Sequence, residues 1–245
     1  MALEYFVILA VIAFFSVVQS IFGMGILVFG TPTLLVMGYD FTTALSHLLP
    51  ASFAISLLQV LTAGSTRIPV SRYLYYFCIP GIGIGFWLAD SVLVASWVNI
   101  LVGCMLILSA FVRFSPPAKQ LLLSALEKYF PVYHLVMGLV HGLTNLGGAM
   151  LAILATNTID NKDETRYVVA HYYLVFSIAQ MLLLATLMGH YESLISNYYS
   201  IITSSVVYLL LGNRIFLRTN TRSFDVAMTI FIAIYGIVLL LKPII

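Results

Sequence analysis

The residues that could bind a ligand gather at two glycine clusters, each inside a long apolar stretch. The first cluster holds Gly23 and Gly25. The second holds Gly147 and Gly148 and follows Asn145. Glycine is costly inside a helix, so clustered glycine in an apolar stretch predicts a helix break. A helix that restarts after a break has about four backbone N–H groups without intrahelical partners, and this end binds anions without a basic side chain.

Polar side chains flank both clusters and are suited to binding the oxygens of an oxyanion. Gln19 and Ser20 flank the first cluster, and His141, Thr144 and Asn145 flank the second. We predict that these side chains and the four glycines form a substrate site. The alternative is that the glycines only allow tight turns.

Composition places this site in a membrane. The chain has 245 residues, of which 62% are hydrophobic and 8% are charged, and its mean hydropathy is +1.06. An ordinary soluble domain is about 45–50% apolar and about 25% charged. These values exclude a cytosolic enzyme and a disordered chain, and the net charge of +2 is too small for a nucleic-acid binder. They predict a polytopic α-helical membrane protein.

Apolar runs of about 20 residues, enough to cross a bilayer, recur along the chain. Simple crossings are predicted at Phe41–Gly64, Tyr73–Ala89, Ser91–Val112, Tyr167–Gly189, Ser193–Gly212 and Val226–Leu241. Within the second of these, Gly81 and Gly85 have the GxxxG spacing that permits close helix packing. The glycine clusters interrupt two other stretches, for which we predict helical hairpins: Tyr5–Phe22 with Ile26–Gly38, and Val132–Thr144 with Ala149–Asn157.

Basic residues favour these hairpins, because lysine and arginine concentrate on the cytoplasmic side of a membrane protein. If each interrupted stretch crossed once, six basic residues would lie on one side and five on the other. With hairpins, ten of the 11 share one side and only Lys242 lies opposite. We therefore expect a multi-pass membrane protein whose basic side is cytoplasmic and whose two termini both lie on the opposite side.

Five segments in each half give the halves opposite orientations, which is typical of inverted repeats in secondary transporters. Ser16–Phe29 aligns with Gly138–Leu151 at an offset of 122, and Thr43–Phe53 aligns with Tyr167–Ser177 at an offset of 124. The predicted fold is all-α and polytopic, with two inverted repeats of about five transmembrane or re-entrant helices each and glycine-broken hairpins. The first repeat is assigned to residues 1–113, a cytoplasmic linker to 114–130 and the second repeat to 131–245.

Four titratable or charged side chains extend the candidate site. His47 and His171 occupy matched repeat positions, so we predict that they contact the substrate or couple its binding to protons near neutral pH. Arg166 and Arg214 are predicted to attract anions or to gate the inner mouth. No pair among these histidines and the two cysteines has helical metal-ligand spacing. We therefore predict no metal, no bound cofactor and no catalytic residue.

Four segments carry a recognisable pattern. A glycine break followed by a short apolar helix occurs as GMGILVFGTP at Gly23–Pro32 and as NLGGAMLAIL at Asn145–Leu154. The other two segments are Ile79–Trp97 and Leu210–Lys242, and the second of these contains GNRIF, the most specific element. Together they resemble the sulfite exporter TauE/SafE family, also called the toluene-sulfonate uptake permease family.

The resemblance implies a transporter, and not an enzyme, that moves small sulfur-containing anions such as sulfite, sulfonates or sulfoacetate across the bacterial inner membrane. With the charge distribution, this places both termini in the periplasm. Ile26 stands where another glycine is common, and Asn145 replaces the first glycine of the second break, which leaves the substrate preference open. The expected partners are a small anion and the lipid bilayer, with no nucleic acid, and the oligomeric state is left open. An anion channel, or a transporter of another small organic anion, is the alternative.

Overall fold

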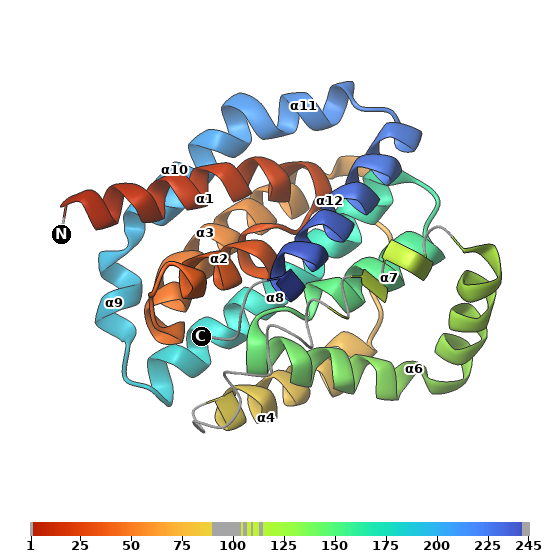
Figure 1. Ribbon diagram of the computed structural model, residues 1–245, viewed down its shortest axis with the longest axis horizontal. Helices are drawn as coiled ribbons and strands as arrows, with labels where there is room; N and C mark the ends of the chain where they lie inside the picture. The colour runs from red at the N-terminus through yellow and green to blue at the C-terminus, as the bar shows by residue number, and fades with distance from the viewer. Residues whose placement is uncertain (1, 90–103, 105–106, 109, 113–114, 242–245) are drawn as a thin grey trace. The chain divides into compact units, whose positions relative to one another are not determined.

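The computed structural model describes residues 2–89, 104, 107–108, 110–112 and 115–241, and every regular element in these ranges is helical (Figure 1). The all-α prediction is confirmed. Among the described helices, those long and apolar enough to cross a membrane are Glu4–Phe22, Phe41–Thr62, Lys162–Thr186 and Tyr198–Arg218. Leu74–Ala89 is apolar but shorter. The predicted crossing Ser91–Val112 lies largely outside the described residues.

The described residues form these elements in chain order. In the first part of the chain they are α1 (Ala2–Phe22), η1 (Ile26–Gly30), α2 (Thr31–Val36), α3 (Phe41–Thr62), η2 (Gly64–Thr66), η3 (Leu74–Cys78) and α4 (Ile79–Ala89). In the later part they are α6 (Pro116–Thr144), α7 (Gly148–Thr158), α8 (Lys162–Thr186), α9 (Tyr191–Ser196), α10 (Tyr198–Val207), η4 (Tyr208–Gly212), α11 (Asn213–Arg218) and α12 (Thr221–Leu241). Here η1, η3 and η4 are π-helical and η2 is a 3-10 turn.

Contacts between α-carbons group the chain into two compact units. The first unit combines Met1–Ile68 with Arg166–Thr219, and the second combines Pro69–Thr165 with Asn220–Ile245. Each unit therefore takes segments from both halves of the sequence. The division into a first repeat, a linker and a second repeat concerns sequence symmetry, and it stays a prediction.

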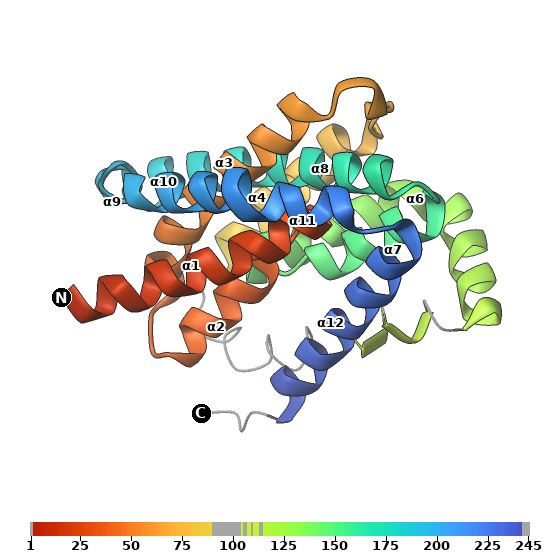
Figure 2. The ribbon, with the colours of Figure 1, turned by 90° about the horizontal axis from the view of Figure 1, so that it is seen from above.

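In the first unit, α1, α3 and α10 lie side by side (Figures 1 and 2). Two polar contacts tie α3 to the segments at either end of α10. The Asn197 side-chain amide donates to the Ser46 hydroxyl over 3.1 Å, and the Thr62 and Tyr208 hydroxyl oxygens lie 2.9 Å apart. Because a buried polar group without a partner is costly, these contacts fix which helix faces meet.

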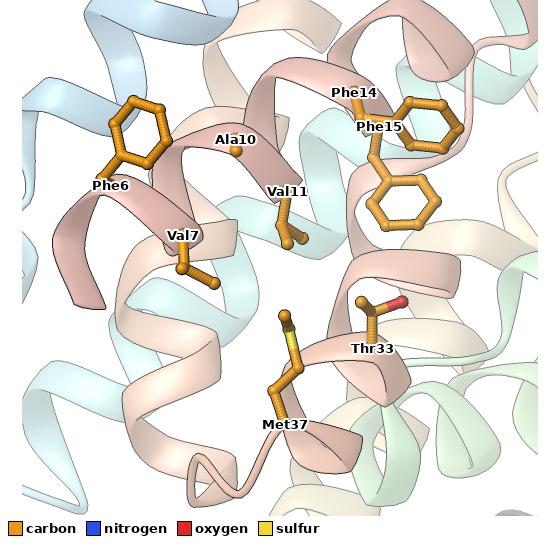
Figure 3. Close-up of a pocket in the computed structure, with 8 residues that line it drawn as sticks. All are labelled: Phe6, Val7, Ala10, Val11, Phe14, Phe15, Thr33 and Met37. Atoms are coloured by element: carbon orange, nitrogen blue, oxygen red, sulfur yellow. The ribbon is translucent and has the colours of Figure 1, made fainter. Parts of the chain in front are cut away.

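The glycine break after α1 reverses the chain, as the hairpin prediction required. Gly23 has φ +78°, a left-handed conformation that glycine adopts without strain. Its N–H closes α1 by donating to the Gln19 carbonyl oxygen over 2.8 Å. After the break, η1 and α2 run back along α1, so that Met37 lies across a groove from Phe6 and Val7 near the start of α1 (Figure 3).

This groove between α1 and α2 has a volume of about 430 Å³ (Figure 3). It is lined by Phe6, Val7, Ala10, Val11, Phe14, Phe15, Thr33 and Met37. Only Thr33 among these side chains is polar, and its hydroxyl already donates to the Phe29 carbonyl oxygen over 2.7 Å. The groove is therefore unsuited to binding an anion, and the polar groups lie at the break instead.

Asp40 begins α3 as its N-cap. Its carboxylate accepts the Thr43 N–H over 2.8 Å and the Thr43 hydroxyl over 2.6 Å. Partial burial by itself raises the pKa of this carboxyl, but hydrogen bonds from Thr42 and Thr43 outweigh burial and lower the pKa from 3.8 to about 2. Because the folded-state pKa is lowered, the stabilising charge is present at neutral pH and is lost as the pH falls from about 4 toward 2.

In the second unit, α4 and α6 cross at close range because both helices carry glycine at the contact. A β-carbon added at Gly81 or Gly85 would meet backbone atoms of α6. One added at Gly138 or Gly142 would meet backbone atoms of η3 or α4. The predicted close packing of Gly81 and Gly85 is confirmed. The same GxxxG spacing in α6 is visible in the sequence and supplies the other side of the contact.

Gly85→Ala is expected to destabilise the protein by about 1–3 kcal/mol, a typical cost of overpacking. The added methyl group would meet the Leu139 carbonyl oxygen of α6. Gly83→Ala on the same helix is the matched control, because nothing lies within 4 Å of that position. The melting temperatures of the two variants in detergent check the expectation, and equal values would contradict the glycine contact.

Two predicted segments are organised differently in the structure. The crossing expected at Ser193–Gly212 is divided, because α9 ends at Ser196 and the membrane-length helix runs over Tyr198–Arg218. Asn197 separates the two with φ −88° and ψ 26°, where its side chain bonds to α3. From Pro116 onward, the predicted linker 114–130 forms the first part of α6, and this helix kinks at Tyr129.

Candidate functional site

Both glycine breaks end the preceding helix with the same backbone conformation. After α1, Gly23 has φ +78°, and its N–H donates to the Gln19 carbonyl oxygen over 2.8 Å. After α6, Asn145 has φ 63°, and its N–H donates to the His141 carbonyl oxygen over 2.7 Å. Glycine and asparagine are the residues that tolerate this left-handed conformation at a helix end. Asn145 therefore takes the structural place of the first glycine.

Gly25 and Gly147 each lie two residues after the left-handed residue of their break. Both pack tightly on the helix that precedes the break. A β-carbon at Gly25 would lie 2.7 Å from the Gln19 nitrogen and 2.9 Å from the carbonyl oxygen four residues before Gln19. One at Gly147 would lie 2.6 Å from His141 Cβ and 2.7 Å from the carbonyl oxygen four residues before His141. Each of these positions in the second break lies 122 residues after its counterpart. The two breaks are therefore built alike.

The first hydrogen bond of each restarted helix also corresponds. The Phe29 N–H donates to the Gly25 carbonyl oxygen over 3.0 Å, and the Leu151 N–H donates to the Gly147 carbonyl oxygen over 3.0 Å. The first restart is π-helical over Ile26–Gly30, whereas α7 is a regular α-helix. The two breaks thus share these local contacts at corresponding positions. The inverted orientation of the two halves stays a prediction.

Gln19 stabilises the first break with both ends of its side-chain amide. Its Oε1 atom accepts the Ile26 N–H over 3.1 Å, which caps the first turn of η1. Its Nε2 atom donates to the Ser52 carbonyl and hydroxyl oxygens and to the Ser56 hydroxyl, over 3.0–3.1 Å. The sequence predicts Gln19 as a ligand of the substrate. In this conformation its amide joins η1 to α3.

Three residues of α3 that were not predicted as site residues complete this break: Ser52, Ser56 and Gln59. Gln59 Nε2 donates to the Gln19 carbonyl oxygen over 2.9 Å and to the Ser20 carbonyl oxygen over 3.0 Å. Gln59 therefore caps the last carbonyl groups of α1. Their spacing of four and three residues places the three side chains on one face of α3. A polar face on an apolar helix was the pattern that could have identified them.

The second break buries the side chains of His141, Thr144 and Asn145. Thr144 Oγ1 donates to the Val140 carbonyl oxygen over 2.6 Å and accepts the Leu146 N–H over 3.1 Å. Thr144 thus links the end of α6 to the turn. The positive end of the α7 dipole lies at the glycine pair that follows.

Arg166 lies against the end of α1. Its side chain is 8% exposed, and Nη1 donates to the Ser20 carbonyl oxygen over 3.3 Å and to Asn213 Oδ1 over 3.2 Å. The guanidinium carbon lies 3.5 Å from the centre of the Phe216 ring. Asn213 and Phe216 belong to the GNRIF element, so this motif holds Arg166. Arg214, between them in sequence, is exposed.

The paired histidines have similar surroundings. The His47 ring is buried and lies edge-on to Tyr5, with ring centres 6.0 Å apart. The His171 ring is half-buried and lies 5.9 Å from the Tyr167 ring. In the part of the chain that the structure describes, no cluster of three or more histidine, cysteine or acidic residues could hold a metal ion.

Membrane-length helices with two matched glycine breaks are features of the secondary transporter class. Residues 8–239, nearly the whole chain, match the family described as Sulfite exporter TauE/SafE, and the chain belongs to this family. Its members are multi-pass membrane transporters of sulfur anions, not enzymes. No curated protein and no solved structure matches the chain.

Proposed function

We propose that this protein is a secondary transporter that moves small anions of the sulfite, sulfonate or sulfoacetate type across the bacterial inner membrane by alternating access of two inverted repeats. The observation that carries the proposal is the pair of matched breaks. Helices interrupted at corresponding positions of two halves mark the binding sites of secondary transporters. Family membership supplies the substrate class.

In this proposal the anion binds at the restarted helices, whose first N–H groups and positive dipole ends favour negative charge. The backbone at Gly25, Gly147 and Gly148 supplies donors. The side chains proposed to assist are Ser20, His141, Thr144 and Asn145, with Gly23 and Gln19 shaping the first break. A neutral set of donors suits a substrate that must also leave the site.

A thermal-shift assay of the detergent-purified protein tests the substrate class. The anions are sulfite, thiosulfate, sulfate, sulfoacetate, taurine, acetate and phosphate. A true ligand is expected to stabilise the protein saturably, by about 2.7 kcal/mol at roughly a hundredfold excess over its dissociation constant. Stabilisation by sulfur oxyanions alone supports the proposal. Stabilisation by acetate or phosphate alone points to another anion class, and no stabilisation contradicts the proposed site.

Counterflow in liposomes separates a carrier from a channel. An alternating-access carrier exchanges labelled sulfite for unlabelled sulfite faster than it moves sulfite in one direction, whereas a channel does not. Absence of such acceleration would contradict alternating access and favour the anion channel.

We propose protons as the coupling ion, with His47 and His171 as the groups that bind them. Replacing both residues by glutamine is expected to flatten the pH dependence of flux near neutrality, because glutamine does not titrate. His134→Gln is the matched control, since this ring packs beside its own helix and contacts the Phe130 carbonyl oxygen over 2.9 Å. An unchanged pH profile in the double variant would remove the histidine pair from coupling.

Cysteine labelling tests the proposed orientation, with periplasmic termini. Asp40→Cys and Asn161→Cys introduce exposed thiols in two separate loops, in a Cys104→Ser background because Cys104 is exposed. An impermeant reagent is expected to reach Asp40→Cys from the periplasm and Asn161→Cys from the cytoplasm. Labelling of both from the same side would contradict the hairpin topology.

A further inference from the structure

The C-terminal end of α1 at the first break is occupied by a buried cation that belongs to the chain itself. The carbonyl groups at the end of a helix carry roughly half a negative charge. Here the Ser20 carbonyl oxygen accepts both Arg166 Nη1 and Gln59 Nε2, over 3.3 Å and 3.0 Å. The charge and hydrogen-bonding capacity of this helix end are therefore largely satisfied from within the protein.

Arg166 is held rigidly in this position. Asn213 Oδ1 accepts a second hydrogen bond from Nη1 over 3.2 Å, and the Phe216 ring stacks on the guanidinium at 3.5 Å. The Arg166 carbonyl oxygen would lie 3.0 Å from a β-carbon at Gly23. The same residue thus contacts the break with its side chain and with its backbone, and it joins α1, α8 and α11.

A close approach by η4 completes this arrangement. A β-carbon added at Gly212 would meet the Ser20 side chain, so only glycine lets η4 come near enough for the following residues to reach Arg166. This explains the order of GNRIF: the glycine permits the approach, the asparagine accepts a hydrogen bond and the phenylalanine stacks.

In broken-helix transporters, the C-terminal end of a half-helix and its carbonyl groups are where a sodium ion or proton binds. We propose that Arg166 is a resident cation at this position, a positioning residue that holds the first break in its binding geometry in place of a bound alkali ion. Transport therefore requires no sodium at this break. The inference rests on the proposed function only in treating the break as the transport site.

Long-range attraction of anions is the competing role for Arg166. Attraction is screened by salt, and the exposed Arg214 would share it. Positioning depends on the geometry of the guanidinium, which has a planar fork and stacks on aromatic rings as an ammonium does not. The two roles therefore differ in their response to salt and in how well lysine replaces arginine.

Chemical rescue provides the experiment. Arg166→Ala is expected to lower the melting temperature and to reduce sulfite flux by about tenfold or more, the scale of a lost charged hydrogen bond. Guanidinium at sub-denaturing concentration is expected to restore both saturably, and sodium is not. Arg218→Ala, an exposed arginine at the end of α11, is the control and should behave as the unmodified protein in both assays.

Two further measurements cover the case in which Arg166→Ala does not fold. Asn213→Ala and Phe216→Leu keep the charge and remove one support of the guanidinium each, and both are expected to reduce flux at high and low salt alike. The unmodified protein is expected to have equal melting temperature and flux in sodium chloride and in choline chloride.

Several results would overturn the assignment. They are a saturable sodium requirement in the unmodified protein, full activity of Arg166→Lys, or no guanidinium rescue of a folded Arg166→Ala that still transports sulfite weakly. Rescue of the melting temperature with no flux of any tested anion would overturn the proposed function and support the structural assignment of Arg166, because the melting temperature requires no substrate.

Discussion

Gly25→Ala and Gly147→Ala are each expected to abolish transport while leaving the protein in the membrane. At each position the added methyl group would lie within 3 Å of backbone atoms of the preceding helix. Since backbone cannot rotate away as a side chain can, η1 or α7 must move off its partner. A displacement of about 1 Å at a binding site costs about a hundredfold in rate. Sulfite flux in liposomes and binding in the thermal-shift assay measure the effect.

Gly30→Ala is the graded control for these variants. A β-carbon at Gly30 would come closest to the methyl groups of Leu48, at 3.1 and 3.3 Å, and a flexible side chain can adjust. This variant is expected to retain most of the flux. Normal transport by Gly25→Ala or by Gly147→Ala would show that the breaks do not form the transport site.

Two substitutions at Asn145 are expected to separate the role of its backbone from the role of its side chain. Asn145 has φ 63°, a conformation that costs roughly 1–2 kcal/mol for a residue other than glycine, asparagine or aspartate. Asn145→Val is therefore expected to lower the melting temperature. Asn145→Gly is expected to keep it, because Gly23 fills the corresponding position of the first break with φ +78°.

Transport by Asn145→Gly then reports on the amide alone. If the amide binds the anion, as we propose, this variant is folded but has weaker substrate stabilisation and lower flux. Normal flux in Asn145→Gly would remove the side chain from the site and leave only its backbone role. A melting temperature as low as that of Asn145→Val would contradict the left-handed turn.

Several features followed from local properties of the sequence. The breaks at Gly23–Gly25 and at Asn145–Gly147 were predictable because glycine and asparagine are the residues that a left-handed helix end requires. The packing of Gly81 and Gly85 followed from their spacing of one helical turn. The hairpin after α1 followed from the distribution of basic residues, although no single contact was predicted.

The partners of these features could not be predicted in the same way. Gln19 has the chemistry of a substrate ligand, yet its amide is hydrogen-bonded to Ser52 and Ser56, more than 30 residues away. Arg166 has the chemistry of a surface attractor of anions, yet it is buried against Ser20, 146 residues distant in sequence. Residue type limits what a side chain can bond to, and packing selects among the possibilities.

The sequence alone determined that this is an α-helical membrane protein of the TauE/SafE type and where its helices break, because hydrophobic run length and left-handed turn residues act over short distances along the chain. Only the tertiary structure decided how each break is satisfied. The amide of Gln19 caps η1, Gln59 caps α1, and Arg166 supplies a buried cation. These groups come together through the packing of α1 with α3, α8 and α11, since a hydrogen bond depends on position in space and not on separation along the chain.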